Sequence, residues 1–597
     1  MLKFDSYSIE KFFILIIILV TLTPSFGAID NNAIRWTLLS VLSAIFLFKL
    51  LLEKKSELSV SVRSSFLVFF SCLYIAFSIF HSYNSIEGLV VSYKLVTILG
   101  VFYSVFTAFR RIESPVIFLS QVFTISLFIE SLFLIFEFIL SDFYVTGISN
   151  NRNISSSSIL VKFSFLIFLT KNSKERYKIG ILKMIELFVI ISIILLQSRF
   201  GLVSLIGIYL SLLLFDRKKR VNYIISLILV TICLVSYSQY DGIKKRDKEY
   251  NLLELKNDES SNQRLSFYSN AFKIIKESPI IGKGIGSWKY ESLKDNKDTR
   301  ERILSSYYTH NDFLQIFVEL GVLGILIYMY FIISLFKSLF RNFYSDESKI
   351  FFLIAIIFLL INSSINFPIH RSQEFIPFVL CASLIFSKDR IDSFNKMKPN
   401  ILYLLIFLII PSSFIGFYEH KSLTVQNQLL LDYKDQNFNL DEKQLSLVSY
   451  KLPNLMANTV PISTYLSRYY FEVGDYERSL DLLKYSTKAN RNDLMTKELI
   501  LKNYIFLDDQ ESAFSVVNDL MSRYPNDEVY AQLYFSIISD LDYIDILIDD
   551  PIIYKSNNII IHKMFHDEIR NYDNVSSDLI MKFIKYSNEM FPNFSFN

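Results

Sequence analysis

Long apolar runs recur through the first 420 of the 597 residues, and no other feature of the sequence limits its fold as much. A helix needs about 20 mostly apolar residues to cross the roughly 30 Å hydrocarbon core of a bilayer. We find about thirteen such runs, more than a soluble domain could bury. They lie near residues 11–27, 33–52, 63–81, 87–109, 114–140, 156–171, 179–197, 200–215, 221–238, 317–340, 348–366, 374–387 and 400–418. The sequence therefore predicts an all-α, polytopic membrane protein with about 12–13 transmembrane helices.

The average composition hides two different segments. Hydrophobic residues make up 52% of the chain and charged residues 20%, not far from a soluble protein. The apolar surplus lies in residues 1–420, whereas charged residues and Asn become frequent after that point. We therefore predict a transmembrane domain over 1–420, which includes a long extracytoplasmic loop at 239–316, and a second domain over 421–597. The net charge of +3 gives no reason to expect a nucleic-acid partner.

Lys and Arg in alternate loops predict the orientation. Clusters near 54–55, 110–111, 171–178, 217–220, 341–349 and 388–398 should face the cytoplasm. The other loops should lie outside: 28–32, 82–86, 141–155, 197–201, 239–316, 363–373 and the chain after 418. The N-terminus is then cytoplasmic and the C-terminal domain extracytoplasmic. The first run could instead be a cleaved signal peptide, which would leave the remaining orientation unchanged.

The C-terminal domain contains an internal repeat. Phe471–Leu483 aligns with Ile505–Val517, and each matched pair is 34 residues apart, for example Asp475 with Asp509 and Ser479 with Ala513. This is the tetratricopeptide period. The pattern predicts a TPR-like domain of helical hairpins that binds a protein partner. A generic helical tail is the alternative.

Cations gather in loops that should lie outside, against the usual bias of membrane proteins. They are Arg152, Arg199, Arg264, His310, His370 and Arg371, with Lys94 in the outer half of the fourth run. Ionisable groups at a membrane are costly, and Arg binds phosphate oxygens through a planar fork. The set predicts a site for an anionic group at headgroup depth, such as a diphosphate. Any single Arg could instead reach lipid headgroups.

The long loop carries further polar signals. The pattern of Asn262–Lys276 predicts a surface helix, which Pro279 ends. The glycines of 282–286 predict a tight turn. They do not predict a nucleotide-binding loop, because that motif needs a Gly-Lys-Ser/Thr ending that is absent here. His310 and Asn311 then precede the tenth run, where an imidazole can take a proton from a hydroxyl. Glu319, deeper in that run, could pair with an Arg or orient another side chain. No compact metal-ligand cluster is visible, so we expect neither a metal nor a cofactor.

These marks resemble the O-antigen ligase/polymerase superfamily, which includes bacterial protein O-oligosaccharyltransferases. The resemblance covers roughly residues 10–420. It rests on Asn151-Arg152-Asn153, Ser198-Arg199, Arg264 with Pro279-x-x-Gly282-x-Gly284-x-Gly286, His310-Asn311-x-x-Leu314 with Glu319-x-Gly321-x-x-Gly324, and Asn366-Phe367-Pro368. The family's ligases commonly have about twelve spans, so the extra run and the tail leave the acceptor open.

The resemblance implies a GT-C-like fold and a metal-independent glycosyltransferase in the bacterial inner membrane. Its donor would be a glycan on undecaprenyl diphosphate, without a cofactor. By position, Arg199 and Arg264 would hold the diphosphate and His310 would assist the acceptor hydroxyl. Residues implied to bind substrate are Lys94, Arg152, Asn311, Glu319, His370 and Arg371.

Three acceptors stay open: lipid A core, a protein Ser/Thr and a growing glycan, the last being the reaction of a polymerase. Two other classes compete with an enzyme. A flippase for lipid-linked glycans would be expected to place its charges along a central cavity and to have repeated halves. A helical-repeat scaffold would need only one membrane anchor.

Overall fold

The computed structural model describes residues 8–53, 62–141, 145–238, 259–294, 307–341, 343–388, 400–541, 543–573 and 575–596. These ranges contain 24 α-helices and no strand, which confirms the all-helical prediction. The chain divides into two compact units. The first contains residues 1–288 and 308–427, and the second contains residues 289–307 and 428–597.

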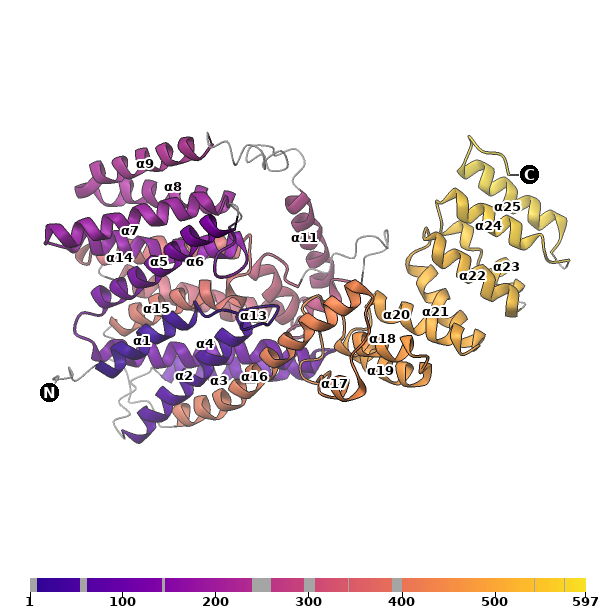
Figure 1. Ribbon diagram of the computed structural model, residues 1–597, viewed down its shortest axis with the longest axis horizontal. Coiled ribbons are helices and arrows are strands. Elements are labelled where there is room, and N and C mark those ends of the chain that lie inside the picture. The colour runs from indigo at the N-terminus through magenta and orange to yellow at the C-terminus, as the bar shows by residue number, and fades with distance from the viewer. Residues whose placement is uncertain are drawn as a thin grey trace. The chain divides into compact units, whose positions relative to one another are not determined.

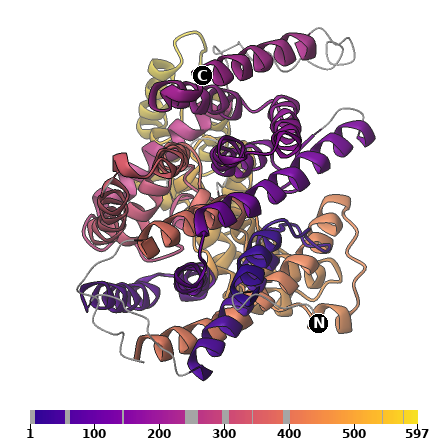
Figure 2. The same ribbon diagram turned by 90° about the vertical axis from the view of Figure 1, so that its left-hand side faces the viewer.

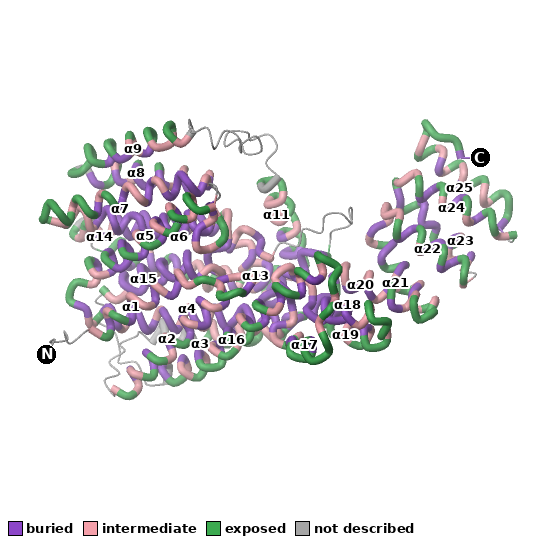
Figure 3. The backbone as a smooth tube through the Cα atoms, viewed as in Figure 1, coloured by how far each residue is buried: buried purple, intermediate pink, exposed green. Residues whose placement is uncertain are grey.

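The first unit is a bundle of mainly apolar helices, with the polar helices α11 and α12 beside them (Figures 1 and 2). They are α1 (Ser8–Val20), α2 (Asn32–Leu52), α3 (Val62–His81), α4 (Ser85–Arg111), α5 (Pro115–Leu140), α6 (Arg152–Asn172), α7 (Arg176–Leu195), α8 (Arg199–Phe215), α9 (Arg220–Ser238), α11 (Glu259–Glu277), α12 (Trp288–Glu291), α13 (Asp312–Phe340), α14 (Ser348–Ser363), α15 (Ser372–Lys388) and α16 (Asn400–Asp435). Helix α12 ends, and α16 continues, in the second unit. Most of α6 is buried, whereas α9 is largely exposed (Figure 3).

Seven helices in the described ranges are long and apolar enough to cross a membrane. They are Asn32–Leu52, Ser85–Arg111, Pro115–Leu140, Arg152–Asn172, Arg220–Tyr237, Asp312–Phe340 and Leu402–Asp435. Three shorter apolar helices accompany them, at Phe69–His81, Arg199–Phe215 and Ser348–Ser363. The protein is therefore a multi-pass membrane protein, and the larger count of 12–13 spans stays a prediction.

The loops that the sequence assigned to one side of the membrane meet one another in the structure. The Asn31 side chain, just before α2, donates to the Ile148 carbonyl ahead of α6, at 2.6 Å. Asn32 donates to the His370 carbonyl ahead of α15, also at 2.6 Å. The N-termini of α2, α6 and α15 therefore lie together at one end of the first unit.

Two further helices begin at the same place. The Ser198 hydroxyl, which caps α8, donates to the Asn153 side chain at the start of α6, at 2.8 Å. At the start of α13, the Asp312 carboxylate accepts the backbone N–H of Ile369 at 3.2 Å. The N-termini of α2, α6, α8, α13 and α15 thus converge.

Basic residues of the other loop set are paired with acids. Glu10 accepts hydrogen bonds from Lys49 and Arg111, each at 2.9 Å, and Lys171 pairs with Asp216 at 2.8 Å. These pairs join neighbouring helix ends, and the separation of the two loop sets across a membrane stays a prediction. Which of them faces the cytoplasm stays a prediction.

Helix α13 is broken at Gly321, where φ is 61° and ψ is −163°. The break frees backbone groups, which cannot stay unpaired at membrane depth. The loop after α11 supplies their partners: the N–H groups of Lys283 and Gly284 donate to the carbonyls of Val318 and Glu319, at 2.9 and 3.0 Å. The sequence analysis predicted one uninterrupted apolar helix at 317–340 and did not predict the break at Gly321. It fixes the glycine turn against α13.

The second unit contains paired helices. They are α17 (Glu442–Ser446), α18 (Ile462–Glu472), α19 (Tyr476–Ala489), α20 (Leu494–Phe506), α21 (Gln510–Arg523), α22 (Glu528–Leu541), α23 (Ile544–Asp549), α24 (Ile559–Ile569) and α25 (Ser577–Met590). The two aligned stretches have the same local structure, because Asp475 caps α19 and Asp509 caps α21. Ser479 and Ala513 are fully buried where small side chains were expected. Their assignment to tetratricopeptide repeats stays a prediction.

Replacing Gly282 by Ala should destabilise the first unit. Its φ is +73°, and an added Cβ would lie 2.5 Å from the carbonyl carbon and oxygen of Glu319. A side chain at positive φ costs more than about 1 kcal/mol when the backbone cannot relax. The thermal unfolding temperature in detergent should therefore fall. Gly207→Ala is the matched control, because nothing lies within 4 Å of its Cβ position. Equal unfolding temperatures would contradict the close packing of this turn.

Reporter fusions should reveal the orientation. Alkaline phosphatase joined after Asn597 should be active, and the same enzyme joined after Lys388 should be inactive, because the basic loops are retained in the cytoplasm. Activity is measured in intact cells, with fusion abundance as the control. The reverse pattern would invert the assignment of the two loop sets.

Candidate functional site

His310 lies in an aromatic enclosure between α11 and α13. Its ring stacks on Phe267 with centroids 6.0 Å apart and meets Phe367 edge-on at 4.9 Å. The Tyr268 hydroxyl donates to the His310 carbonyl at 3.0 Å. The backbone at His310 has a positive φ of 56°, so the turn is held in a conformation that non-glycine residues seldom adopt. These contacts fix the direction of the imidazole.

The surroundings of His310 keep its ring neutral. Burial, followed by the nearby charges of Arg264 and Arg371, lowers the pKa of His310 to about 4. Its Nδ1 and the Nε of Arg264 are buried without a hydrogen-bond partner among the described residues. A neutral imidazole with an open ring nitrogen can accept a hydrogen bond from a hydroxyl at pH 7, and as a base of low pKa it takes the proton only once bond formation has made that hydroxyl acidic. The structure thus brings His310, Arg264 and Arg371 close together, and their role in a single functional site stays a prediction.

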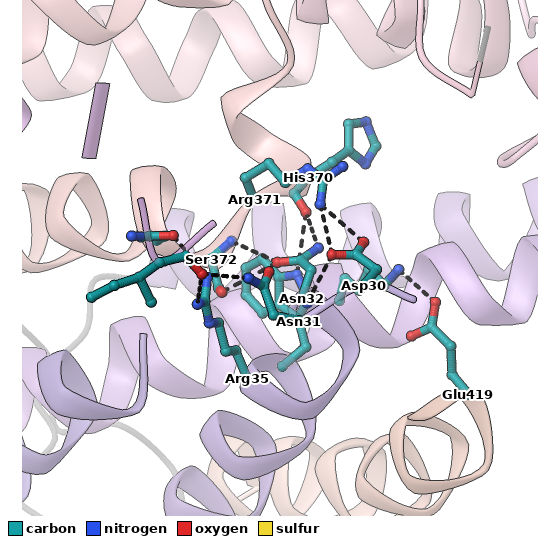
Figure 4. A network of polar contacts seen from close by, with 12 residues as sticks. Asp30, Asn31, Asn32, Arg35, His370, Arg371, Ser372 and Glu419 are labelled. Carbon is teal, nitrogen blue, oxygen red and sulfur yellow. Dashed lines mark hydrogen bonds and ion pairs between the residues drawn. The ribbon is translucent and has the colours of Figure 1, made fainter. Parts of the chain in front are cut away.

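His370 and Arg371 are held beside this enclosure. Arg371 pairs with both carboxylate oxygens of Asp30, at 2.9 and 3.0 Å (Figure 4). Its guanidinium also lies over the ring of Tyr308, at 5.6 Å. The Tyr308 ring packs on His370 with centroids 4.7 Å apart and stacks on Phe367 at 4.4 Å. Both predicted cations therefore contact the aromatic rings around His310.

Asn32 and Arg35 of α2 organise this turn, and the sequence interpretation missed them. Asn32 bonds the backbone on both sides of Arg371: it donates to the His370 carbonyl and accepts from the Ser372 N–H at 3.1 Å (Figure 4). Arg35 donates to the side chain of Gln373 at 2.7 Å and is only 1% exposed. An arginine inside a predicted span is itself a signal of function, and it could have identified Arg35.

Arg152 and Arg199 begin neighbouring helices. Arg152 donates to the Gln197 side chain and to the Val145 carbonyl, both at 3.2 Å. Arg199 opens α8, and the next residue, Phe200, stacks on Phe358 of α14 at 5.6 Å. This contact is made by Phe200 and does not place the Arg199 side chain, so a position of Arg199 beside His310 stays a prediction.

Asn311 and Glu319 hold backbone segments of the site in place. Asn311 caps α13, and its side-chain amide donates to the Ser364 carbonyl at 3.0 Å, at the end of α14. Glu319 accepts the Gly286 N–H at 2.9 Å and the Gln315 side-chain amide at 3.2 Å. Glu319 therefore connects α13 to the glycine turn.

Comparison with known families identifies part of this unit. Residues 185–329 match the family model described as O-Antigen ligase. The chain carries an O-antigen ligase family domain. No curated protein and no solved structure matches the chain. The matched range contains Arg199, Arg264, His310, Asn311 and Glu319, and the resemblance is confirmed over this range.

Lys94 lies outside the matched O-antigen ligase domain. Its ammonium pairs with Glu419 of α16 at 2.8 Å, and both side chains are buried. Tyr93 donates to the other oxygen of the same carboxylate. The pair joins α4 to α16, and its direct role in substrate binding stays a prediction.

The geometry around the O-antigen ligase domain favours an anionic ligand. Backbone N–H groups and the helix dipole make each helix N-terminus attractive to anions. Helices α2, α6, α8, α13 and α15 begin together here, and Arg152, Arg199, Arg264 and Arg371 lie among them. Within the residues that the structure describes, no group of three or more His, Cys, Asp or Glu could hold a metal ion.

His310 should make stability depend on pH in a defined direction. Its pKa is about 4 in the folded protein and about 6.5 in an unfolded chain. As the pH falls from 6.5 towards 4, the unfolded state binds this proton first, so the wild type loses stability relative to His310→Gln. Unfolding temperatures of both proteins, measured from pH 7 to pH 4.5, test this. Parallel curves would contradict the burial of a neutral imidazole, since the other ionisable groups are common to both.

Proposed function

We propose that the protein is a metal-independent glycosyltransferase of the bacterial inner membrane. It moves an oligosaccharide from undecaprenyl diphosphate to an acceptor outside the cytoplasm. The O-antigen ligase domain implies a ligase- or polymerase-type function on lipid-linked glycans. The observation that carries the proposal is the neutral His310 beside Arg264 and Arg371, where helix N-termini converge.

In this reaction the acceptor hydroxyl attacks the anomeric carbon of the donor sugar. The new carbon–oxygen bond forms as the bond to the diphosphate breaks, and the diphosphate leaves with the bonding electrons. His310 takes the hydroxyl proton. Arg264 and Arg199 stabilise the negative charge that develops on the leaving group, where fixed charges in a dry site are most effective. The positive electrostatic potential that attracts the diphosphate is strengthened by Arg152, His370 and Arg371.

The acceptor is lipid A core or a protein Ser/Thr, and a growing glycan is the alternative. A helical-repeat unit supports a polypeptide acceptor or a partner protein, because stacked hairpins commonly bind peptides. Glycan analysis of a deletion strain separates these cases. Loss of glycan from lipopolysaccharide, loss from glycoproteins and shortened polymers correspond to the three acceptors.

Replacing Arg264 or His310 by Ala should reduce glycan transfer by at least 100-fold, the usual effect of removing one transition-state contact. Transfer is measured in membranes with matched enzyme abundance and matched levels of lipid-linked donor. Arg199→Lys should also impair transfer, because Lys lacks the planar fork. Arg176→Ala is the control, since Arg176 is exposed at the start of α7. Wild-type rates for both Ala variants would contradict the assigned site.

Deleting residues 437–597 should reduce transfer to the acceptor much more than it reduces the affinity for the donor. The deletion leaves α16 complete and removes most of the second unit. Undecaprenyl diphosphate binding should stay within about twofold of the wild type, whereas transfer to the acceptor should fall at least tenfold. Protein abundance and unfolding temperature are the controls. Loss of donor binding in a folded deletion protein would place the tail in the donor site.

A further inference from the structure

The C-terminal part of the chain is strongly acidic, in contrast to the chain as a whole. Residues 428–597 contain 26 Asp and Glu residues and 16 Lys and Arg residues, whereas the whole chain has a net charge of +3. An excess of this kind creates a negative electrostatic potential, which attracts basic partners and repels acidic ones. Anionic lipid headgroups are therefore poor partners for this unit, and a basic polypeptide is a suitable one.

Two turns of the second unit have the same shape and the same exposed pattern. One joins α18 to α19, and the other joins α20 to α21 (Figure 1). Val473 and Leu507 end α18 and α20, and each is followed by a residue of positive φ, Gly474 at 83° and Asp508 at 58°. A left-handed residue at this position closes a helix with a defined turn. The side chains of Val473 and Leu507 are 74% and 39% exposed, so both turns present an apolar side chain to the surroundings.

Phe506 joins the two turns into one apolar surface. Its ring stacks on Tyr476 with centroids 5.2 Å apart and meets Phe471 edge-on at 5.4 Å. The side chain of Phe506 is nonetheless 59% exposed. Exposed aromatic side chains that neighbouring rings hold in place are typical of binding surfaces, because little side-chain entropy is lost when a partner covers them. The turn patch is defined as Val473, Tyr476, Phe506 and Leu507.

Exposed carboxylates lie in the same two turns as the turn patch. Arg468 and Arg478 are close in sequence, but they pair with Glu472 and Glu442, at 2.5 and 2.6 Å. Lys502 of α20 is exposed and is outnumbered by the carboxylates of the turns. These carboxylates are Asp475, Glu477, Asp508, Asp509 and Glu511. The turn patch is thus an apolar surface within a negative surrounding, which is complementary to apolar side chains flanked by Lys or Arg.

The spacing of the two turns limits the shape of the partner. Helices α18 and α20 pack against each other, and the axes of packed helices are about 8–10 Å apart. On a helix, residues seven apart lie on one face and are separated by about 10 Å. We propose that the turn patch binds a basic amphipathic helix of a partner protein. Its apolar side chains cover Phe506, and its Lys or Arg residues, seven apart, pair with carboxylates of the two turns. This surface lies outside the O-antigen ligase domain, and binding to it does not depend on the proposed transfer reaction.

A synthetic helix tests this surface. The probe is a fluorescein-labelled peptide of Leu, Ala and Lys, with lysines seven residues apart beside a stripe of leucines. Its binding to the full-length protein in phosphatidylcholine nanodiscs is measured by fluorescence anisotropy, with empty nanodiscs as the background. A second peptide has Glu in place of Lys, and a third has the composition of the first in shuffled order. At 0.15 M salt the first peptide should bind at least tenfold more tightly than either of the others, because charge and apolar pattern must both match. Equal affinity for the Lys and Glu peptides would overturn the proposal.

Paired substitutions separate the turn patch from the overall charge of the unit. Asp508→Asn with Glu511→Gln removes two charges of the turns, and Asn tolerates the positive φ at position 508. Asp578→Asn with Glu589→Gln removes two exposed charges of α25 and is the matched control. The first pair should weaken binding of the Lys peptide about tenfold and the control pair less than twofold, because only charges beside the bound helix pair with it. Equal effects would show that net charge alone attracts the peptide, and would overturn the proposal.

The apolar side chains of the turn patch have a control of the same kind. Val473→Ser with Leu507→Ser should weaken binding of the Lys peptide about fivefold, whereas Met581→Ser with Met590→Ser, which changes exposed side chains of α25, should leave it unchanged. Wild-type affinity in the first pair would overturn the proposal. A second copy of this chain is the other candidate occupant. Dimers of the full-length protein in mass photometry that Val473→Ser with Leu507→Ser abolishes would identify that occupant instead.

Discussion

The convergence of helix N-termini at one end of the first unit is the constraint on which the site depends. Cations at a membrane surface repel one another, and they gather only where other groups hold them. Asn32 does this for the His370–Arg371 turn by bonding the backbone on both sides of it. Asp30 neutralises part of the charge of Arg371. The helix N-termini and the remaining cations then leave a region of positive potential, which an anionic ligand completes.

The break in α13 connects this region to the membrane interior. Because Gly321 interrupts the helix, the glycine turn after α11 can bond directly to its backbone. Glu319 strengthens the same junction by accepting the Gly286 N–H. The first segment of α13 carries His310 at its start, so the break determines where the imidazole lies. A rigid junction of this kind suits the proposed site, in which a diphosphate and a proton acceptor would be held in fixed geometry.

The sequence predicted well what depends on local patterns. Apolar runs identified the helices, and alternate loop charges identified which loops meet. Arg264 and His310 lie close together in the structure, and their shared role stays a prediction. Contacts between distant residues were not predictable in the same way. Lys94 pairs with Glu419, 325 residues away, and no local pattern indicates that partner. The break at Gly321 also escaped detection, because the apolar run continues through it and the loop that satisfies its backbone is distant in sequence.

Binding of undecaprenyl diphosphate tests the central claim, that converging helix N-termini and cations form a diphosphate site. The affinity of undecaprenyl diphosphate for the full-length protein in nanodiscs is compared with the affinity of undecaprenol, which has the same hydrocarbon chain without phosphates. We expect at least 100-fold tighter binding of the diphosphate at 0.15 M salt, and loss of most of that preference in Arg264→Ala. Equal affinity for the two lipids, or a preference that Arg264→Ala leaves intact, would contradict it.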